Sequence, residues 1–355
     1  MNLGLGYYFF GKAVDAMYER RWFLWASGVV GALLILFALG QLAIPGQAAE
    51  PEATGPVSWE AESALPLLPM PTENTSPPPD WQEAEGMDGS HIFVWDCEKG
   101  EMLYCATDPR ESLYPASITK LFSAWVALRY LDPGTKITAG KELGLLKSGS
   151  STAYIAYGSV LTAEMLIEGM LLPSGNDAAY VLAAAAGRAI LGEETASAQK
   201  AVEVFVEEMN RRAEELGLTG TRFENPDGYH NESHYSCPED LAAIGMLALE
   251  EPVIARYVRC RSDSVRWASG ETCTWRNTNR LLNPDSEFYS PWAVGLKTGY
   301  TKQAGYCLLA AFQQEEKTLL VGIFGAQEKT SRYANAVKLM ELSWGTTVGV
   351  GFQPS

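Results

Sequence analysis

The sequence predicts an α+β domain with an antiparallel sheet, preceded by one N-terminal transmembrane helix and a tether. Three observations support this prediction. An uncharged apolar run occupies residues 22–44, a proline-rich stretch follows at residues 45–88, and a globular region covers residues 89–345. Strand-like segments lie at both ends of that region and helical segments lie between them, which is typical of an α+β layer sandwich.

The apolar run is long enough to cross a bilayer. Residues 22–44 contain no charged side chain, and as a helix they would span roughly 34 Å. Arg20 and Arg21 directly precede the run, whereas the next Lys or Arg after it is Lys99. Because positive residues favour the cytoplasmic side, we expect residues 1–21 in the cytoplasm and everything after the helix outside.

The prediction is therefore a single-pass protein of the cell membrane whose globular domain is extracytoplasmic. A cleaved signal peptide is the alternative, with a small-residue cleavage region at 46–50. The apolar run is longer than a usual signal core, which favours an uncleaved signal anchor. Residues 45–88 are rich in Pro, Glu, Ala, Ser and Thr and predict an extended tether. Residues 346–355 form a short C-terminal tail.

Hydrophobic periodicity predicts the elements of the globular region. Apolar and polar residues alternate on both sides of a Lys99-Gly100 turn, which indicates a β-hairpin. Apolar residues at helical spacing predict helices, and two apolar runs predict buried strands. The predicted helices cover residues 117–131, 162–172, a segment from 176 onward, 198–217 with Gly217 as C-cap, and 331–345; the predicted strands cover 304–314 and 316–326.

Charge and cysteine content argue against nucleic-acid binding and against a zinc site. The net charge is −16, whereas binding phosphates requires a basic surface. The six cysteines form no Cys-x-x-Cys, and with only three histidines no zinc spacing occurs. Cys97 with Cys105, or Cys260 with Cys273, could each lie in one hairpin, but the predicted turns do not place either pair opposite each other. We therefore expect neither disulfide.

A serine and a lysine occur three residues apart in Tyr114-Pro-Ala-Ser-Ile-Thr-Lys120. Residues i and i+3 share a helix face, so the Lys120 amine can reach the Ser117 hydroxyl. Serine needs an adjacent base to become a nucleophile, and a buried lysine can supply one. The same spacing recurs in Ser197-Ala-Gln-Lys200, so the motif alone does not distinguish a nucleophile from a helix cap.

Two further motifs follow in order along the chain. Ser174-Gly175-Asn176 lies between two apolar helices, and Lys297-Thr298-Gly299 lies just before the predicted strand at 304–314. Together they supply a proton route, an amide that orients a carbonyl, and a cation for an anionic substrate group. Ser-x-x-Lys, Ser-x-Asn and Lys-Thr-Gly in this order are the motif set of penicillin-binding proteins and class A β-lactamases.

On these motifs, residues 89–345 resemble the low-molecular-mass D-alanyl-D-alanine carboxypeptidases, the S11 serine peptidases. The segments "LLPSGNDAAYVLA" and "FENPDGYHNESHYSCPEDLA" are similar to that family as well. The resemblance implies a five-stranded antiparallel sheet flanked by helices, with an all-helical subdomain. It also implies no metal and no other cofactor.

The resemblance implies a role for each motif residue. Ser117 resembles the acylated nucleophile and Lys120 its general base. Ser174 resembles the residue that relays a proton to the leaving amine, and Asn176 the residue that holds the substrate amide. The backbone N–H groups of Ser117 and Tyr300 would form the oxyanion hole. Substrate binding falls to Lys297, Thr298, Gly299 and Tyr300.

The resemblance implies removal of the terminal D-Ala from peptidoglycan stem peptides, with β-lactams as covalent inhibitors. Contact with the membrane through residues 22–44 is expected from the apolar run alone, which lies outside the resemblance. A DD-endopeptidase acting on cross-links is the nearest alternative, and an inactive wall-binding scaffold is an alternative of another class. A class A β-lactamase would need a Glu-x-x-Leu-Asn after Asn176, and an α/β-hydrolase would need Gly-x-Ser-x-Gly; neither occurs. A Ser-His-Asp triad would have to use His230 or His234, which we interpret as structural.

Overall fold

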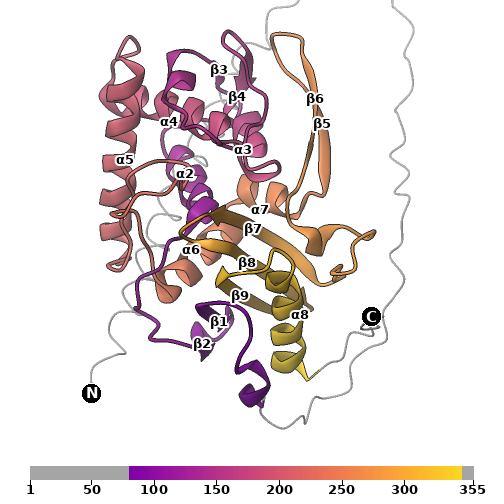
Figure 1. Cartoon of the computed structure of the whole chain (residues 1–355). Coiled ribbons are helices and arrows are strands. Elements are labelled where there is room, and N and C mark those ends of the chain that lie inside the picture. Colours follow the sequence, from indigo (N-terminus) through magenta and orange to yellow (C-terminus); the bar gives the residue numbers. More distant parts are fainter. Residues whose placement is uncertain (1–79, 346–355) are drawn as a thin grey trace, which may run out of the picture. The chain divides into compact units, whose positions relative to one another are not determined.

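The computed structural model describes residues 80–345, whose centre is one five-stranded antiparallel sheet. The strand order is β2-β1-β9-β8-β7 (Figure 1). The predicted five-stranded antiparallel sheet is therefore confirmed. The strands are β1 His91–Asp96, β2 Glu101–Cys105, β7 Ala293–Thr301, β8 Gly305–Gln314 and β9 Lys317–Ala326.

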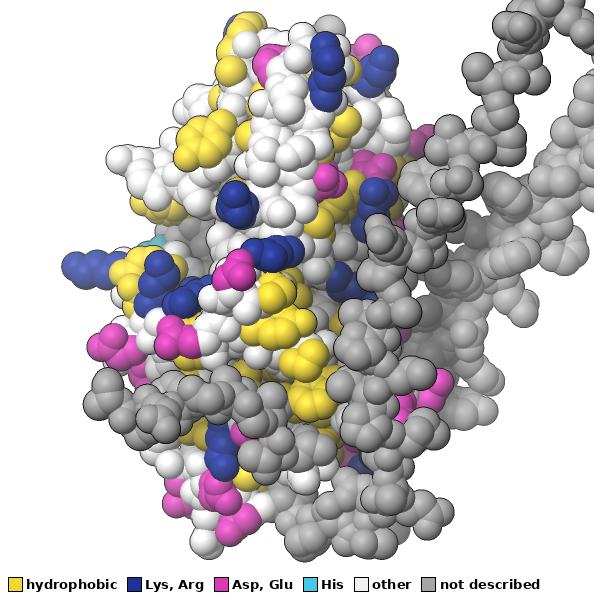
Figure 2. Space-filling model, turned by 90° about the vertical axis from the view of Figure 1, so that its right-hand side faces the viewer, with side chains coloured by type: hydrophobic (Ala, Val, Ile, Leu, Met, Phe, Trp, Pro, Cys, Tyr) yellow, Lys and Arg dark blue, Asp and Glu magenta, His cyan; other side chains and the backbone are white. Residues whose placement is uncertain are grey.

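The predicted transmembrane helix at 22–44 lies outside the described residues, as do the cytoplasmic segment, most of the tether and the tail. Between residues 80 and 345, no helix has the length and apolar character needed to span a membrane. Figure 2 shows one face of this region, on which Lys and Arg side chains are interspersed with Asp and Glu side chains.

Apolar side chains cover both faces of the central strands. Along β9, Val321 and Ile323 belong to a cluster with helix α8 (Ser331–Trp344), whereas Leu320 and Phe324 belong to the core under the other helices. Successive side chains of a strand point to opposite faces, so an unbroken apolar run fits a strand that is buried on both sides. This explains why the sequence of β9 shows no alternation.

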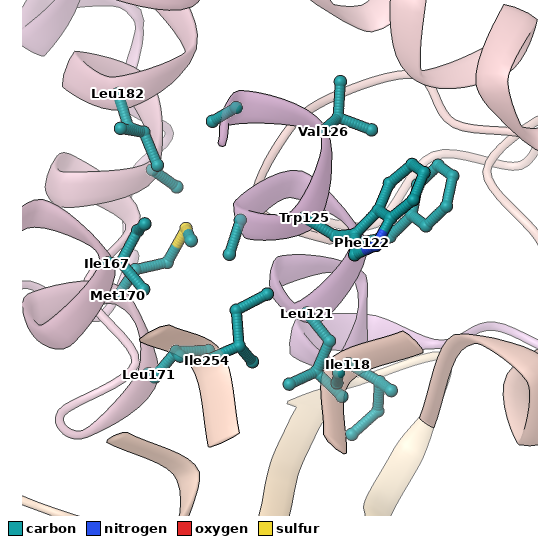
Figure 3. Close-up of a cluster of buried hydrophobic side chains, with 14 of the residues drawn as sticks. Ile118, Leu121, Phe122, Trp125, Val126, Ile167, Met170, Leu171, Leu182 and Ile254 are labelled. Atoms are coloured by element: carbon teal, nitrogen blue, oxygen red, sulfur yellow. The ribbon is translucent and has the colours of Figure 1, made fainter. Parts of the chain in front are cut away.

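Helix α2 (Thr119–Ala127) lies at the centre of the helical side, and each of its residues is buried. Figure 3 shows its side chains, including Leu121 and Val126, among apolar side chains of the surrounding helices. Burying one such side chain contributes about 1.5–3 kcal/mol, so the helix that follows Ser117 is firmly held. The surrounding helices are α3 Ala163–Leu171, α4 Asn176–Leu191, α5 Ala198–Glu215, α6 Pro238–Glu250 and α7 Pro252–Arg259.

The helical side is not entirely helical, which corrects the expectation of an all-helical subdomain. It also contains two short antiparallel hairpins, β3–β4 and β5–β6. Trp275 of β6 is buried, and its ring N–H donates to the carbonyl of Ala153 at 3.0 Å, which fixes the second hairpin to the neighbouring loop. The strands are β3 Lys136–Thr138, β4 Val160–Thr162, β5 Ser262–Arg266 and β6 Thr272–Arg276.

Most predicted elements are observed, with differences at their ends. The helix expected over 117–131 begins later, at Thr119, because Ser117 lies in a 3₁₀ turn, η2 (Ala116–Ile118). It also ends earlier than expected, at Ala127. The helix expected over 198–217 ends at Glu215, and Gly217 has a φ of 75°, as the predicted C-cap requires.

The packed structure starts before the boundary predicted at residue 89. A 3₁₀ turn covers Trp81–Ala84, and the ring of Trp81 stacks on that of Tyr104 with centroids 4.9 Å apart. The carboxylate of Asp88 accepts the backbone N–H groups of Gln327 and Glu328 at 2.8 and 2.9 Å. Residues 81–88 are therefore part of the domain rather than of the tether.

All six cysteines are unpaired. In the β1–β2 hairpin the residue opposite Cys105 is Phe93, and in the β5–β6 hairpin the residue opposite Cys273 is Val265. The hairpin registers therefore place neither candidate pair face to face.

Candidate active site

Ser117 and Lys120 are in direct contact at the N-terminal end of α2. The Lys120 Nζ donates to the Ser117 Oγ at 2.8 Å and to the carbonyl oxygen of Asp227 at 2.7 Å. Lys120 is fully buried, and Ser117 is half-buried. The predicted pairing of a serine hydroxyl with a lysine amine is thus present in the geometry.

Burial shifts the ionisation of this lysine. Removal from water lowers the pKa of Lys120 from 10.5 to about 8, while the nearby carboxylates of Asp227 and Asp177 oppose the shift. A second buried lysine, Lys297, has its pKa lowered well below the usual value by burial and by the positive charges of Lys120 and Arg332. A substantial fraction of Lys120 is therefore uncharged near pH 8 and able to accept a proton.

The Ser174-Gly175-Asn176 motif forms the turn from α3 into α4. Ser174 is buried and has a φ of 65°, a left-handed conformation that is uncommon for a residue with a side chain. The Asn176 Nδ2 donates to the Ser150 Oγ at 3.1 Å, and the Ser151 Oγ donates to the Ser174 carbonyl at 2.6 Å. These contacts hold the motif against the loop that contains Ser150 and Ser151.

Asp177, which follows the Ser174-Gly175-Asn176 motif, bonds to the same loop. The buried carboxylate of Asp177 accepts the backbone N–H groups of Ala153 and Ile155 at 2.7 and 2.9 Å. A Cβ atom added to Gly175 would lie 2.7 Å from the Cβ of Ala153, so the loop contacts the motif too closely for any residue but glycine there.

The Lys297-Thr298-Gly299 motif lies inside β7, the edge strand of the sheet, and the predicted strand β8 follows it as expected. Lys297 is buried, and the hydroxyl of Thr298 is 2.6 Å from that of Thr278. A Cβ atom on Gly299 would lie 3.0 Å from the backbone nitrogen of Ser117. The glycine therefore allows β7 to run directly along the turn that contains Ser117.

Tyr300 follows this motif, and its side chain is 56% exposed. Its ring lies 4.5 Å, between centroids, from that of Tyr306. The resemblance assigns the oxyanion-hole role to the backbone N–H of Tyr300 and not to this exposed side chain.

Two site residues were not identified from the sequence. The segment "NPDGYH" is part of the family resemblance. The sequence does not indicate, however, that the carbonyl oxygen of Asp227 accepts a hydrogen bond from the Lys120 amine. Arg332 of α8 donates to the carbonyls of Gly299 and Cys307 at 2.9 and 2.8 Å and so links β7 and β8 to the helix. No local pattern marks Arg332, because its partners become neighbours only in the folded chain.

The described part of the chain contains no group of three His, Cys, Asp or Glu side chains that could hold a metal ion. The residues gathered here are a serine, two lysines, hydroxyls and an amide. Such a set can carry out acyl transfer through an activated hydroxyl.

Comparison with known proteins agrees with this constellation. A profile of the D-alanyl-D-alanine carboxypeptidase family, Peptidase S11, matches residues 77–328. The chain belongs to this family. D-alanyl-D-alanine carboxypeptidase DacF of Bacillus subtilis is 31% identical over 252 residues, which cover 70% of this chain and 60% of DacF. The D-alanyl-D-alanine carboxypeptidase of Streptomyces sp. strain K15 is 32% identical over 251 residues, with 68% of this chain and 82% of the relative covered.

Two solved structures share the fold. The Streptomyces K15 DD-transpeptidase matches with a TM-score of 0.65 at 28% identity, over 73% of this chain and 98% of the neighbour. Penicillin-binding protein D2 of Listeria monocytogenes, in its ampicillin-bound form, matches with a TM-score of 0.59 at 25% identity and the same coverage.

The unusual ionisation of Lys120 is directly measurable. We expect its amine to titrate near pH 8, because burial disfavours its charged form. Asp227→Asn should lower the pKa further, since the Asp227 carboxylate raises it. NMR titration of protein labelled with ¹³Cε-lysine measures both values, and Lys120→Arg assigns the signal. Titration of that signal near pH 10.5 would contradict the buried, partly neutral base.

Proposed function

We propose that this S11 family member is a serine-type D-Ala-D-Ala carboxypeptidase that removes the terminal D-Ala from peptidoglycan stem peptides. The observation that carries the proposal is the 2.8 Å contact from the Lys120 Nζ to the Ser117 Oγ. This contact joins a hydroxyl to a buried amine whose pKa is lowered to about 8. A base with a pKa near the working pH is the most effective for proton abstraction.

The reaction proceeds in two steps. Lys120 takes the proton of Ser117 as its Oγ bonds to the carbonyl carbon between the two D-Ala residues. The C–N bond then breaks, and the leaving amine of the terminal D-Ala receives the proton through the hydroxyl of Ser174. Water next attacks the resulting ester and gives a proton to Lys120, which returns it to Ser117 as the peptide leaves.

The remaining motif residues position the substrate in this proposal. Lys297 and Thr298 receive the terminal carboxylate, and Asn176 holds the substrate amide. The N–H groups of Ser117 and Tyr300 stabilise the oxyanion, and in related acyl transfer one such donor lowers the barrier by about 3 kcal/mol. A β-lactam would acylate Ser117 by the same route, which is supported by the ampicillin-bound form of the Listeria neighbour.

A fluorescent penicillin tests the acyl-enzyme. We expect covalent labelling of the wild type at low micromolar probe and none of Ser117→Ala, because the Oγ is the attacking atom. Ser197→Ala, in the second Ser-x-x-Lys, is the matched control and should label normally. Incubation with a pentapeptide should release free D-Ala, whereas cleavage of a cross-linked dimer instead would indicate an endopeptidase. An unlabelled wild type would contradict the proposal.

The approach of β7 to Ser117 gives a second test. Gly299→Ala places a Cβ atom 2.9 Å from that of Ala116 and 3.0 Å from the Ser117 nitrogen. The strand must shift, so we expect acylation to slow by about 10- to 100-fold. Gly134→Ala adds a methyl with nothing within 4 Å and is the control. Stopped-flow acylation of folded protein measures the effect, and a wild-type rate in Gly299→Ala would contradict the proposed geometry.

We further propose that residues 22–44 anchor the protein in the cell membrane, with residues 45–79 as the extracytoplasmic tether. The support is the uncharged run and the arginines that precede it. In this arrangement residues 1–21 remain part of the protein and lie on the cytoplasmic side.

The intact mass of membrane-extracted protein tests the anchor. We expect a mass that includes residues 1–50. A mass that shows cleavage near residues 46–50 would instead indicate a signal peptide. Deletion of residues 1–45 behind a heterologous cleavable signal is the control, and it should release an active domain into the medium.

A further inference from the structure

The residue that precedes the nucleophile has a strained backbone. Ala116 has a φ of 49° and is buried, and a left-handed conformation is unfavourable for a residue with a Cβ. Its carbonyl accepts the Thr119 hydroxyl at 2.8 Å. Gly228 packs so closely that an added Cβ atom would lie 1.8 Å from the Ala116 carbonyl oxygen. The surroundings therefore hold Ala116 in this conformation.

A buried histidine continues this chain of hydrogen bonds. The His234 Nε2 lies 2.8 Å from the Thr119 Oγ1. Because the single hydroxyl proton of Thr119 is donated to Ala116, Thr119 accepts from His234. The Nδ1 of His234 accepts the backbone N–H of Glu224 at 3.2 Å. Both contacts assign the neutral tautomer with its proton on Nε2.

The environment keeps this ring neutral. His234 is 2% exposed, and burial lowers its pKa to about 3, with smaller contributions from the charges of His230 and Lys120. Both ring nitrogens are occupied by structural partners. His234 is therefore unable to act as the base of a Ser-His-Asp triad.

The segment that contains His234 also holds the base. The carbonyl of Asp227 accepts the Lys120 amine, and Gly228 packs against the Ala116 carbonyl. Seven residues from Asp227, His234 bonds to Thr119. One loop thus fixes both the lysine and the turn that presents the serine.

We propose that His234 is a positioning residue for the nucleophile. Through Thr119 it holds the left-handed Ala116, and so sets the direction of the Ser117 N–H and Oγ relative to Lys120. This inference rests on the proposed acyl transfer at Ser117. His234 itself touches neither substrate nor reacting atoms.

Two matched pairs of variants test the hydrogen bonds that link His234, Thr119 and Ala116. Thr119→Val removes the hydroxyl at nearly constant volume, whereas Thr119→Ser keeps it. His234→Leu removes the donor to Thr119, whereas His234→Gln places an amide N–H near the position of Nε2. Stopped-flow kinetics with a fluorescent penicillin separates the acylation rate constant from reversible binding, and thermal unfolding gives the folded fraction.

We expect Thr119→Val and His234→Leu to lower the acylation rate constant of folded protein by about 10- to 100-fold, because the nucleophile is misaligned. Reversible binding should change by less than about threefold, and Thr119→Ser and His234→Gln should recover most of the rate. The double variant Thr119→Val/His234→Leu should be no slower than either single variant, because both substitutions break the same series of hydrogen bonds.

Several outcomes would overturn the inference. Wild-type acylation in folded Thr119→Val would do so, and so would multiplicative effects in the double variant. If His234→Leu fails to fold, Thr119→Val and its Ser control still decide the question. Absence of acylation in the wild type would instead remove the proposed function itself, so the two failures are distinguishable.

Discussion

The site depends on a lysine that is kept out of water. Burying an amine is costly unless its hydrogen bonds are satisfied, and Lys120 satisfies two of them with the Ser117 hydroxyl and the Asp227 carbonyl. The same burial that costs stability lowers the pKa to about 8 and makes the amine a usable base. Nearby carboxylates limit the shift, so the lysine is neither fully charged nor fully neutral near pH 8.

This burial requires three separate parts of the chain to meet. Helix α2 is enclosed by apolar side chains and supplies the serine and the lysine. The 225–234 loop covers the lysine from one side, and β7 closes the other side because Gly299 has no Cβ to separate it from the Ser117 backbone. Arg332 then fixes β7 and β8 to α8, so the strand that contributes Lys297 belongs to the rigid sheet. The helical side and the sheet are therefore both parts of the site.

Local pattern predicted the elements well where periodicity was strong, as in α5 and the β8–β9 hairpin. It missed β7, since a strand interrupted by Gly295 and Gly299 and carrying a buried lysine has neither alternation nor an apolar run. It also missed the packing of residues 81–88, because Asp88 finds its partners far along the chain. The motif residues could be predicted from the sequence because the order of the three motifs is informative. Asp227, Arg332 and the Thr119–His234 contact could not be, because each acts through a contact formed only on folding.

Backbone strain in the described chain is concentrated where the motifs are. Four residues other than glycine have a positive φ between residues 80 and 345: Ala116, Tyr154, Ser174 and Glu315. Glu315 lies in the tight β8–β9 turn, where such a conformation is ordinary. Ala116 directly precedes Ser117, and Ser174 is itself a motif residue. Tyr154 lies between the two residues whose N–H groups donate to the Asp177 carboxylate. Because each such residue costs about 1–3 kcal/mol, strain persists only where surrounding contacts impose it. The Thr119 hydroxyl holds the Ala116 carbonyl, and the Ser151 hydroxyl holds the Ser174 carbonyl. The Asp177 carboxylate holds the N–H groups on either side of Tyr154. The backbone geometry of the motifs therefore depends on neighbouring side chains that are not themselves motif residues.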